Sequence, residues 1–310
     1  MAGEKQSNLK KTAASIEGVV DSATLKLLEG AQKTQTTTFR GVLVLIKKLD
    51  LNPTGTIKQT AKNMKVLNEI RRVVENLVIN KAYEKRVGSF VGEFEAIEKL
   101  NKNYYTTLAA AFNPSKAVFK QILKNQQQLT INSLLESGIN ANIVEPIKNI
   151  IQQNVTAGGN FDDLVTQLRE EIKGVEAVTG KLGKISKTGK LGSLERYSGQ
   201  IATDSLNQYS ANYGQAVTAD LGLEWVWYSG GKKRTSRSYC KKRAGKYFHV
   251  KEMEDSASLS WSGKIPGTDA SNIFTKRGGY NCQHLYVGTD TEVVPKKVID
   301  RNVANGNYTP

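Results

Sequence analysis

Apolar residues at alternating three- and four-residue steps are the feature of this sequence that most restricts its fold. Between residues 58 and 108 they form two consecutive stripes, which contain Met64, Leu67, Ile70, Val74, Leu77, Phe90, Phe94, Ile97, Leu100, Tyr104 and Leu108. This spacing places apolar side chains on one face of an α-helix. Gly88 and Gly92 interrupt the pattern, and each costs a helix about 1 kcal/mol relative to alanine. We therefore expect a kink or a break there.

Helical patterns continue on both sides of this region. The spacing from Ile16 to Leu27 predicts a short helix, and the Gln- and Thr-rich segment 32–38 predicts a loosely ordered stretch after it. Asn113 and Pro114 are expected to cap and start another helix. A last long helix is expected over residues 194–221, with Gly222 as its C-terminal stop.

The character of the chain changes after this helix. Residues 174–193 are rich in Gly and Lys and predict an exposed basic linker. Residues 223–228 alternate like a β-strand, and all three tryptophans lie beyond residue 220. The sequence therefore predicts an α+β protein: a mostly helical body over 1–193, a helix plus a small basic β module over 194–295, and a polar tail over 296–310.

Both cysteines and both histidines of the chain fall in the C-terminal module, namely Cys240, His249, Cys282 and His284. Two Cys and two His make a complete tetrahedral ligand set, so a structural zinc ion is one interpretation. Buried thiols in a small core, a Cys240–Cys282 disulfide in an oxidising environment and simply exposed histidines are the others. The spacing matches no standard zinc finger.

A dense basic run overlaps this set. Nine basic and no acidic residues lie between positions 232 and 251. The residues that we expect to contact DNA are Lys232, Lys233, Arg234, Arg237, Lys241, Lys242, Arg243 and Lys246. The whole chain has 44 basic and 29 acidic residues, a net charge of +15, and an excess of this size favours a polyanionic partner. An acidic protein surface would suit the run as well as double-stranded DNA.

Catalytic and membrane functions find little support in the sequence. No phosphate-binding loop, HExxH or GxSxG motif occurs, and we assign no catalytic residue. The longest apolar run, residues 42–46, is far shorter than the roughly 20 residues that cross a bilayer. The polar N-terminus has no secretory signal, so we expect a soluble protein made in a cytoplasm.

Residues from about 150 to 288, less than half of the chain, resemble the head-morphogenesis or minor head protein family of tailed phages. The order of elements carries the resemblance: the helix segment 201–208, Trp225, Arg234-Thr235 before Cys240, Gly245-Lys246 with Phe248, and Asn281-Cys282-Gln283-His284. The family often has Cys-x-x-Cys where this chain has Arg237 and Cys240. Its closing Cys-x-Cys is Cys-x-His here, and Gly279-Tyr280 replaces the preceding His-Pro. If the family cysteines bind metal, the resemblance implies that two imidazoles replace two sulfurs, with His249 as one of them.

The resemblance implies a non-enzymatic component of the virion. Such a protein contacts the portal or the inner capsid and the packaged DNA, aids head assembly or genome delivery, and can form homo-oligomers in the particle. It is present in the host cytoplasm during assembly. Two alternatives remain at this stage: an effector enzyme carried in the head that uses Cys282 with a histidine, and a general DNA-binding protein outside any virion.

Overall fold

The computed structural model describes residues 2–175 and 189–310. Helices hold 69% of the chain, and the few strands are antiparallel, so the predicted α+β class with a helical body and a small β module is confirmed. The α-helices are α1 (Ala2–Ile46), α2 (Ala61–Val78), α3 (Lys81–Leu108), α4 (Ala117–Leu135), α5 (Ser137–Ile139), α6 (Glu145–Ala157), α7 (Phe161–Lys173), α8 (Ser193–Asp220), α9 (Ser238–Arg243), α10 (Val250–Asp255), α11 (Ile273–Lys276) and α12 (Lys296–Ala304). A π-helical segment, Asn140–Val144, joins α5 to α6, and short 3-10 turns occur at Ser256–Ser258 and Thr291–Val293.

Two small sheets complete the secondary structure. Strands β1 (Gly174–Val175) and β2 (Lys190–Leu191) pair with each other. Strands β3 (Trp225–Tyr228), β4 (Tyr247–His249) and β5 (Tyr286–Thr289) form an antiparallel sheet in the order β4-β3-β5. None of the helices within the described ranges is long and apolar enough to cross a membrane.

The chain divides into two compact units, each built from separate stretches of sequence. Unit 1 contains residues 1–22, 92–127 and 203–310, and unit 2 contains residues 23–91 and 128–202. These borders differ from the predicted ones at 193 and 295, because long helices such as α1 and α8 contribute residues to both units. The predicted polar tail 296–310 contains helix α12.

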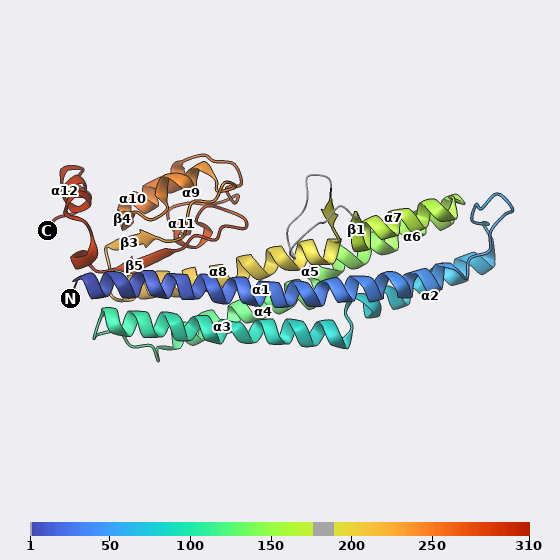
Figure 1. Ribbon diagram of the computed structural model, residues 1–310, viewed down its shortest axis with the longest axis horizontal. Coiled ribbons are helices and arrows are strands. Elements are labelled where there is room, and N and C mark those ends of the chain that lie inside the picture. The colour runs from blue at the N-terminus through green and yellow to red at the C-terminus, as the bar shows by residue number, and fades with distance from the viewer. Residues whose placement is uncertain (1, 176–188) are drawn as a thin grey trace. The chain divides into compact units, whose positions relative to one another are not determined.

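Unit 1 has an aromatic helical layer beneath the three-stranded sheet. Tyr105 of α3 and Phe119 of α4 both pack on Tyr213 of α8, with ring centroids 6.4 and 4.8 Å apart. The Tyr104 hydroxyl donates to the Gly288 carbonyl at 3.0 Å and so ties α3 to β5. Helices α9 and α10 lie on the other side of the sheet (Figure 1). All residues of β3 and β5 are consequently buried.

Unit 2 has an aliphatic core in which α6 packs on α2 and α7. The shared core residues are fully buried branched side chains, including Ile70, Val74, Ile147, Ile151, Val155, Leu164 and Leu168. Asn160 caps α7, since its side-chain oxygen accepts from Asp162 N. The predicted basic linker falls mostly on residues 176–188, which lie outside the described residues.

Three expectations about helix ends were wrong. The segment 32–38 is not loose but part of α1, because Thr38 donates to the Leu77 carbonyl and Gln35 accepts from Glu195 N, which satisfies these polar side chains inside unit 2.

Helix α3 runs unbroken through Gly88 and Gly92, and the break lies instead before Lys81, where Asn80 caps the new helix through Tyr83 N. Asn113 forms a turn with Ser115, and α4 begins only at Ala117.

Candidate metal centre and basic surface

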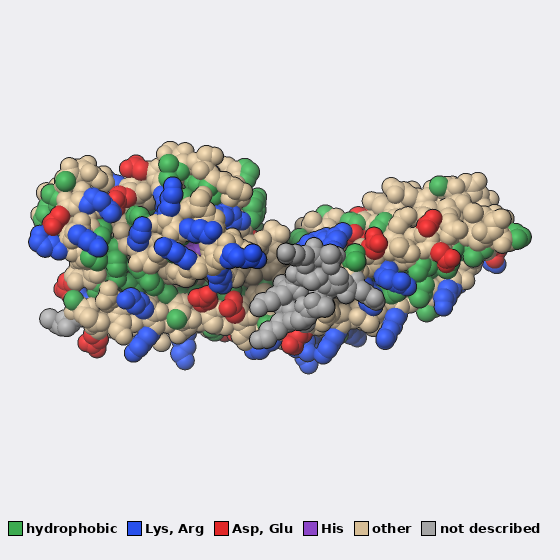
Figure 2. Space-filling view, turned by 45° about the horizontal axis from the view of Figure 1, so that its top comes forward, with side chains coloured by type: hydrophobic (Ala, Val, Ile, Leu, Met, Phe, Trp, Pro, Cys, Tyr) green, Lys and Arg blue, Asp and Glu red, His purple; other side chains and the backbone are tan. Residues whose placement is uncertain are grey.

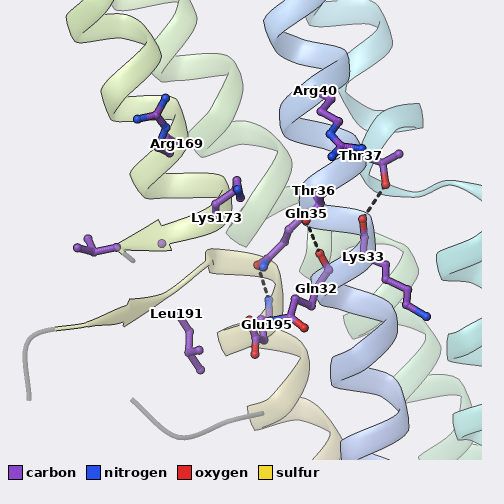
Figure 3. Close-up of a pocket in the computed structure, with 12 residues that line it drawn as sticks. Gln32, Lys33, Gln35, Thr36, Thr37, Arg40, Arg169, Lys173, Leu191 and Glu195 are labelled. Carbon is purple, nitrogen blue, oxygen red and sulfur yellow. Dashed lines mark hydrogen bonds between the residues drawn. The ribbon is translucent and has the colours of Figure 1, made fainter. Parts of the chain in front are cut away.

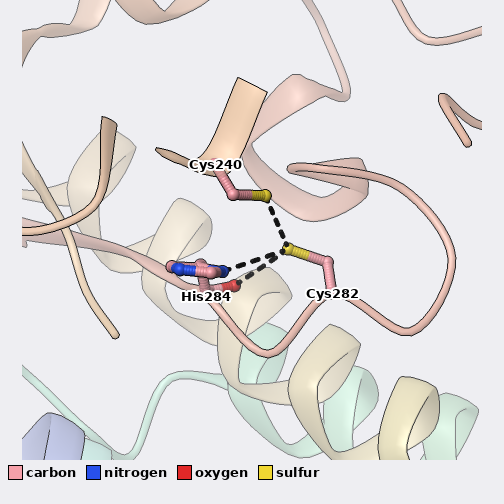
Figure 4. A group of neighbouring side chains, drawn as sticks. All are labelled: Cys240, Cys282 and His284. Atoms are coloured by element: carbon pink, nitrogen blue, oxygen red, sulfur yellow. Dashed lines mark hydrogen bonds between the residues drawn. The ribbon is translucent and has the colours of Figure 1, made fainter. Parts of the chain in front are cut away.

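Cys240, Cys282 and His284 converge in the C-terminal module (Figure 4). One ligand atom from each lies within 4.8 Å of the others. The two Sγ atoms are 3.8 Å apart, and Cys282 Sγ is 3.8 Å from His284 Nδ1. All three side chains are buried, with exposures of 2, 2 and 6%. This group could hold a metal ion.

Sheet register explains why residues more than 40 positions apart meet here. Tyr228 pairs with Tyr286, so the end of β3 and the segment just before β5 lie at the same end of the sheet. Helix α9 follows β3 after a loop and brings Cys240 to that end. Gly278 supplies the space, since a Cβ atom there would lie only 2.3 Å from Cys240 Sγ and 3.0 Å from Cys282 Sγ.

The His284 ring is oriented as a metal ligand would be. Its Nε2 lies 3.2 Å from the Gly231 carbonyl oxygen, which can only accept a hydrogen bond, so Nε2 carries the proton. The Nδ1 lone pair is therefore free to face Cys282. Metal-binding histidines commonly donate their second ring N–H to a backbone carbonyl in this way.

The surroundings shift the pKa values of the two thiols in opposite directions. The hydrogen bond from Cys240 lowers the pKa of Cys282 well below its usual range, with a further contribution from the charge of Arg277, whereas burial opposes the shift. The same hydrogen bond and burial raise the pKa of Cys240.

A buried arginine lies beside the centre. Arg277 is 1% exposed and adopts a left-handed backbone conformation, with φ of 48°. Its Nε and Nη1 atoms have no hydrogen-bond partner among the described residues. Its charge also acts on Asp204, whose carboxylate accepts from Asn281 N at 2.8 Å and whose pKa is raised by burial.

The structure does not bring His249, the fourth predicted ligand, into this group. His249 ends β4 and caps α10: its Nδ1 accepts from Lys251 N at 3.2 Å, and Glu252 reaches back to its backbone N–H. With Nδ1 engaged as an acceptor, Nε2 carries the proton and has no lone pair for a metal. The ring packs instead against Trp225 and Tyr308. The predicted four-residue set is thus corrected to three.

The disulfide alternative does not describe this structure, in which both cysteines are free. Their sulfur atoms are 3.8 Å apart, and a disulfide bond is about 2.05 Å long.

The eight predicted DNA-contacting residues divide by their contacts. Arg237 and Arg243 are half-buried and make contacts within the module. Arg237 donates to the Tyr280 carbonyl, and Arg243 Cζ lies 3.8 Å from the Tyr239 ring centroid. Lys233 pairs with Gln283 and Glu17, and Lys241 donates to the Arg234 carbonyl. The other four are exposed, and their side chains have no hydrogen-bond or ion-pair partner among the described residues: Lys232, Arg234, Lys242 and Lys246. We refer to these four as the free cations. In the view of Figure 2, many Lys and Arg side chains lie on the visible face of the C-terminal module.

A cavity of about 560 Å³ in unit 2 has a basic rim (Figure 3). Lys33 and Arg40 reach it from α1, and Arg169 and Lys173 from α7. Within residues 2–175 and 189–310, no carboxylate lies close enough to form an ion pair with any of the four. Glu195 lines the cavity but is 3% exposed, and burial raises its pKa. The rim is suited to an anionic group.

Comparison with known proteins gives no family. No family model, curated protein or solved structure matches this chain. The resemblance to phage minor head proteins therefore stays a prediction.

Sequence reasoning missed three residues at the centre, namely Tyr228, Arg277 and Gly278. Tyr228 is the last residue of β3, and its hydroxyl lies 3.4 Å from Cys240 Sγ and 3.6 Å from Cys282 Sγ. The sequence places Tyr228 in the predicted strand 223–228, but it does not indicate that the side chain faces two sulfur atoms.

Proposed function

We propose that this protein is a non-enzymatic structural protein that contacts double-stranded DNA through its C-terminal module, and that a structural zinc ion holds this module together. The observation that carries the proposal is the position of Cys240. It lies on α9, the six-residue helix that also bears Lys241 and Lys242, and the loop before α9 bears Lys232 and Arg234. One buried cross-link would thus fix the elements that present the cations.

Zinc suits the chemistry of the three ligands better than harder cations do, since thiolate and imidazole are its usual donors. Cys240, Cys282 and His284 would bind it and so join α9, the loop after α11 and the segment just before β5. A bound structural zinc ion contributes on the order of 10 kcal/mol to small domains. Because all three ligands are buried, this role is structural.

The free cations support a phosphate-binding role. Their charges are not neutralised within the part of the chain that the structure describes, so a polyanion would gain their full attraction. The basic rim of the unit 2 cavity offers a second group of such charges.

The setting that we propose is the head of a tailed phage, as the sequence resemblance implies. There the protein would contact the portal or inner capsid and the packaged genome, in one or several copies, after synthesis in the host cytoplasm. Presence of the protein in purified particles would support this setting. Its absence from particles, with DNA binding intact, would favour the general DNA-binding alternative.

A salt titration of duplex DNA binding by the full chain tests the central claim. Replacing Lys232, Arg234, Lys242 and Lys246 by Gln removes the free cations. We expect the slope of log K against log salt to become shallower by roughly 0.9 for each phosphate that the variant no longer neutralises. The control replaces four exposed lysines of unit 2, Lys47, Lys58, Lys65 and Lys85, which changes the net charge equally. An equal change of slope in both variants would contradict a localised DNA site.

Alkylation of the thiols distinguishes the proposal from the effector-enzyme alternative. For a structural metal, Cys240 and Cys282 should become reactive only after chelation. Labelling of Cys282 without chelation, together with loss of a turnover activity, would support the enzyme instead.

A further inference from the structure

Tyr228 is in contact with every member of the metal centre. Its hydroxyl oxygen lies 3.4 Å from Cys240 Sγ and 3.6 Å from Cys282 Sγ. Its ring stacks on His284, with centroids 5.1 Å apart and planes inclined by only 6°. The side chain is 0% exposed. Two sulfurs, one imidazole nitrogen and one phenol oxygen are thus gathered in one buried place.

Three of the distances match a tetrahedral set of donors, whereas Cys282 Sγ and His284 Nδ1, 3.8 Å apart, are slightly farther from each other than the roughly 3.5 Å of a sulfur and a nitrogen ligand. Two sulfurs, each about 2.3 Å from a tetrahedral metal, lie about 3.8 Å apart, and a sulfur and an oxygen ligand lie about 3.5 Å apart. The observed Sγ–Sγ distance is 3.8 Å, and the two Sγ–Oη distances are 3.4 and 3.6 Å. The phenol oxygen is therefore as far from both sulfurs as a fourth ligand would be.

We propose that Tyr228 is the fourth protein ligand of this centre and closes it to ligands from solvent. The inference rests on the metal site of the proposed function. When a divalent ion binds, the Tyr228 O–H bond and the S–H bonds of Cys240 and Cys282 break, their protons leave to solvent, and the oxygen and both sulfurs bond to the metal. No electron is transferred.

Burial, and then the neighbouring Cys282 and Cys240, raise the pKa of Tyr228 well above its usual value, so positive charge has to offset the cost of a phenolate here. Two thiolates, one phenolate and a divalent ion carry a net charge of −1. The buried Arg277 provides positive charge beside Cys282, and two of its guanidinium nitrogens have no hydrogen-bond partner among the described residues. The four donor side chains are at most 6% exposed, so an external ligand has little access.

Loading the full-length protein with Co²⁺ tests the proposal, because the visible spectrum of this ion reports its coordination. Azide serves as a small external ligand. We expect that azide leaves the spectrum of the Co²⁺-loaded wild type unchanged. In Tyr228→Phe, Co²⁺ should bind at least tenfold more weakly, and azide should shift its spectrum through the open position. The matched control is Tyr286→Phe, since the Tyr286 hydroxyl bonds to Tyr239 at 2.7 Å.

The outcomes separate the two proposals. If the wild type binds neither Co²⁺ nor Zn²⁺, the metal site itself fails. If it binds Co²⁺ and azide shifts its spectrum, the site stands but Tyr228 does not close it. The near-ultraviolet difference spectrum of the wild type gives a second measurement that does not depend on how the variant folds: metal addition should produce the absorbance of a phenolate, and its absence would overturn the proposal.

Discussion

Gly278 leaves the space that the two sulfur atoms of the candidate metal centre need. Since a Cβ atom at this position would lie 2.3 Å from Cys240 Sγ, Gly278→Ala must displace a sulfur or the backbone. We expect a decrease of about 1–3 kcal/mol in the free energy of unfolding, typical of overpacking, together with weaker metal binding. Chemical denaturation and metal titration measure the two effects.

Gly231→Ala is the matched control, because a Cβ atom there meets nothing within 4 Å. Equal behaviour of the two alanine variants would mean that the space beside the sulfurs is not needed.

The histidine that does not belong to the centre should affect stability at acid pH. Burial lowers the pKa of His249 from 6.5, and Lys251 lowers it further, whereas the facing carboxylates Glu224 and Glu252 oppose the shift. The unfolded chain therefore binds a proton more readily than the folded protein. Stability falls as pH drops below about 6.5, and the loss is complete below the folded pKa.

His249→Asn should remove this acid-side loss while preserving the helix cap, since Asn is a good N-cap residue that does not titrate. Urea denaturation of both proteins between pH 5 and pH 7.5 measures the difference. Parallel curves for wild type and variant would show that His249 titrates alike in both states.

These residues also show what the sequence could not reveal about the site. The clustering of Cys240, Cys282 and His284 in one module was visible as a composition bias. His249 lies in the same Cys- and His-containing part of the sequence. Its Nδ1 accepts from the backbone N–H of Lys251, however, and this contact exists only in the folded turn. Nothing in the sequence marks Tyr228 as part of the site, because tyrosine is common in β-strands.

At the scale of elements, one buried amide joins the start of α2 to the end of α1. Asn63 is 0% exposed; its Oδ1 accepts from Asp50 N at 2.8 Å, and its Nδ2 donates to the carbonyls of Asp50 and Lys58. Replacing it by Ala leaves the Asp50 N–H without a partner, at a cost of about 1–3 kcal/mol, whereas the carbonyls of Asp50 and Lys58 still accept from Lys58 N and Thr60 N.

We therefore expect Asn63→Ala to lower the free energy of unfolding by about 1–3 kcal/mol. Asn103→Ala, at an exposed position within α3, should change it by less than about 0.5 kcal/mol. Chemical denaturation of the two variants is the measurement. A small effect at Asn63 would indicate that water replaces the missing hydrogen bonds.

Several of the long helices were predictable because their apolar stripes carry local information, as in α2. The continuity of α1 was not. Its Gln- and Thr-rich segment is buried through Thr38 and Gln35, whose partners Leu77 and Glu195 lie 39 and 160 residues away. Because Gln and Thr side chains are usually exposed, the sequence pattern alone assigns such a segment to a loop.

At the scale of the whole molecule, metal and DNA binding should be coupled, because both depend on α9. A six-residue helix is not stable by itself, and Cys240 is the residue that would anchor it to the metal centre. Lys242 on the same helix and Lys232 and Arg234 in the preceding loop are then presented in a fixed arrangement. Without the metal, the cations remain but must be ordered when DNA binds, which costs affinity.

We expect chelation to weaken duplex DNA binding by the full chain at least about fivefold, the lower end of usual coupling energies, and to leave the salt slope nearly unchanged. Because coupling is reciprocal, saturating duplex DNA should raise the metal affinity by the same factor. Fluorescence anisotropy with and without chelator measures the first effect, and metal titration with and without DNA measures the second. If both affinities are unaffected, the metal centre and the free cations act independently, and the cross-link at Cys240 does not serve DNA binding.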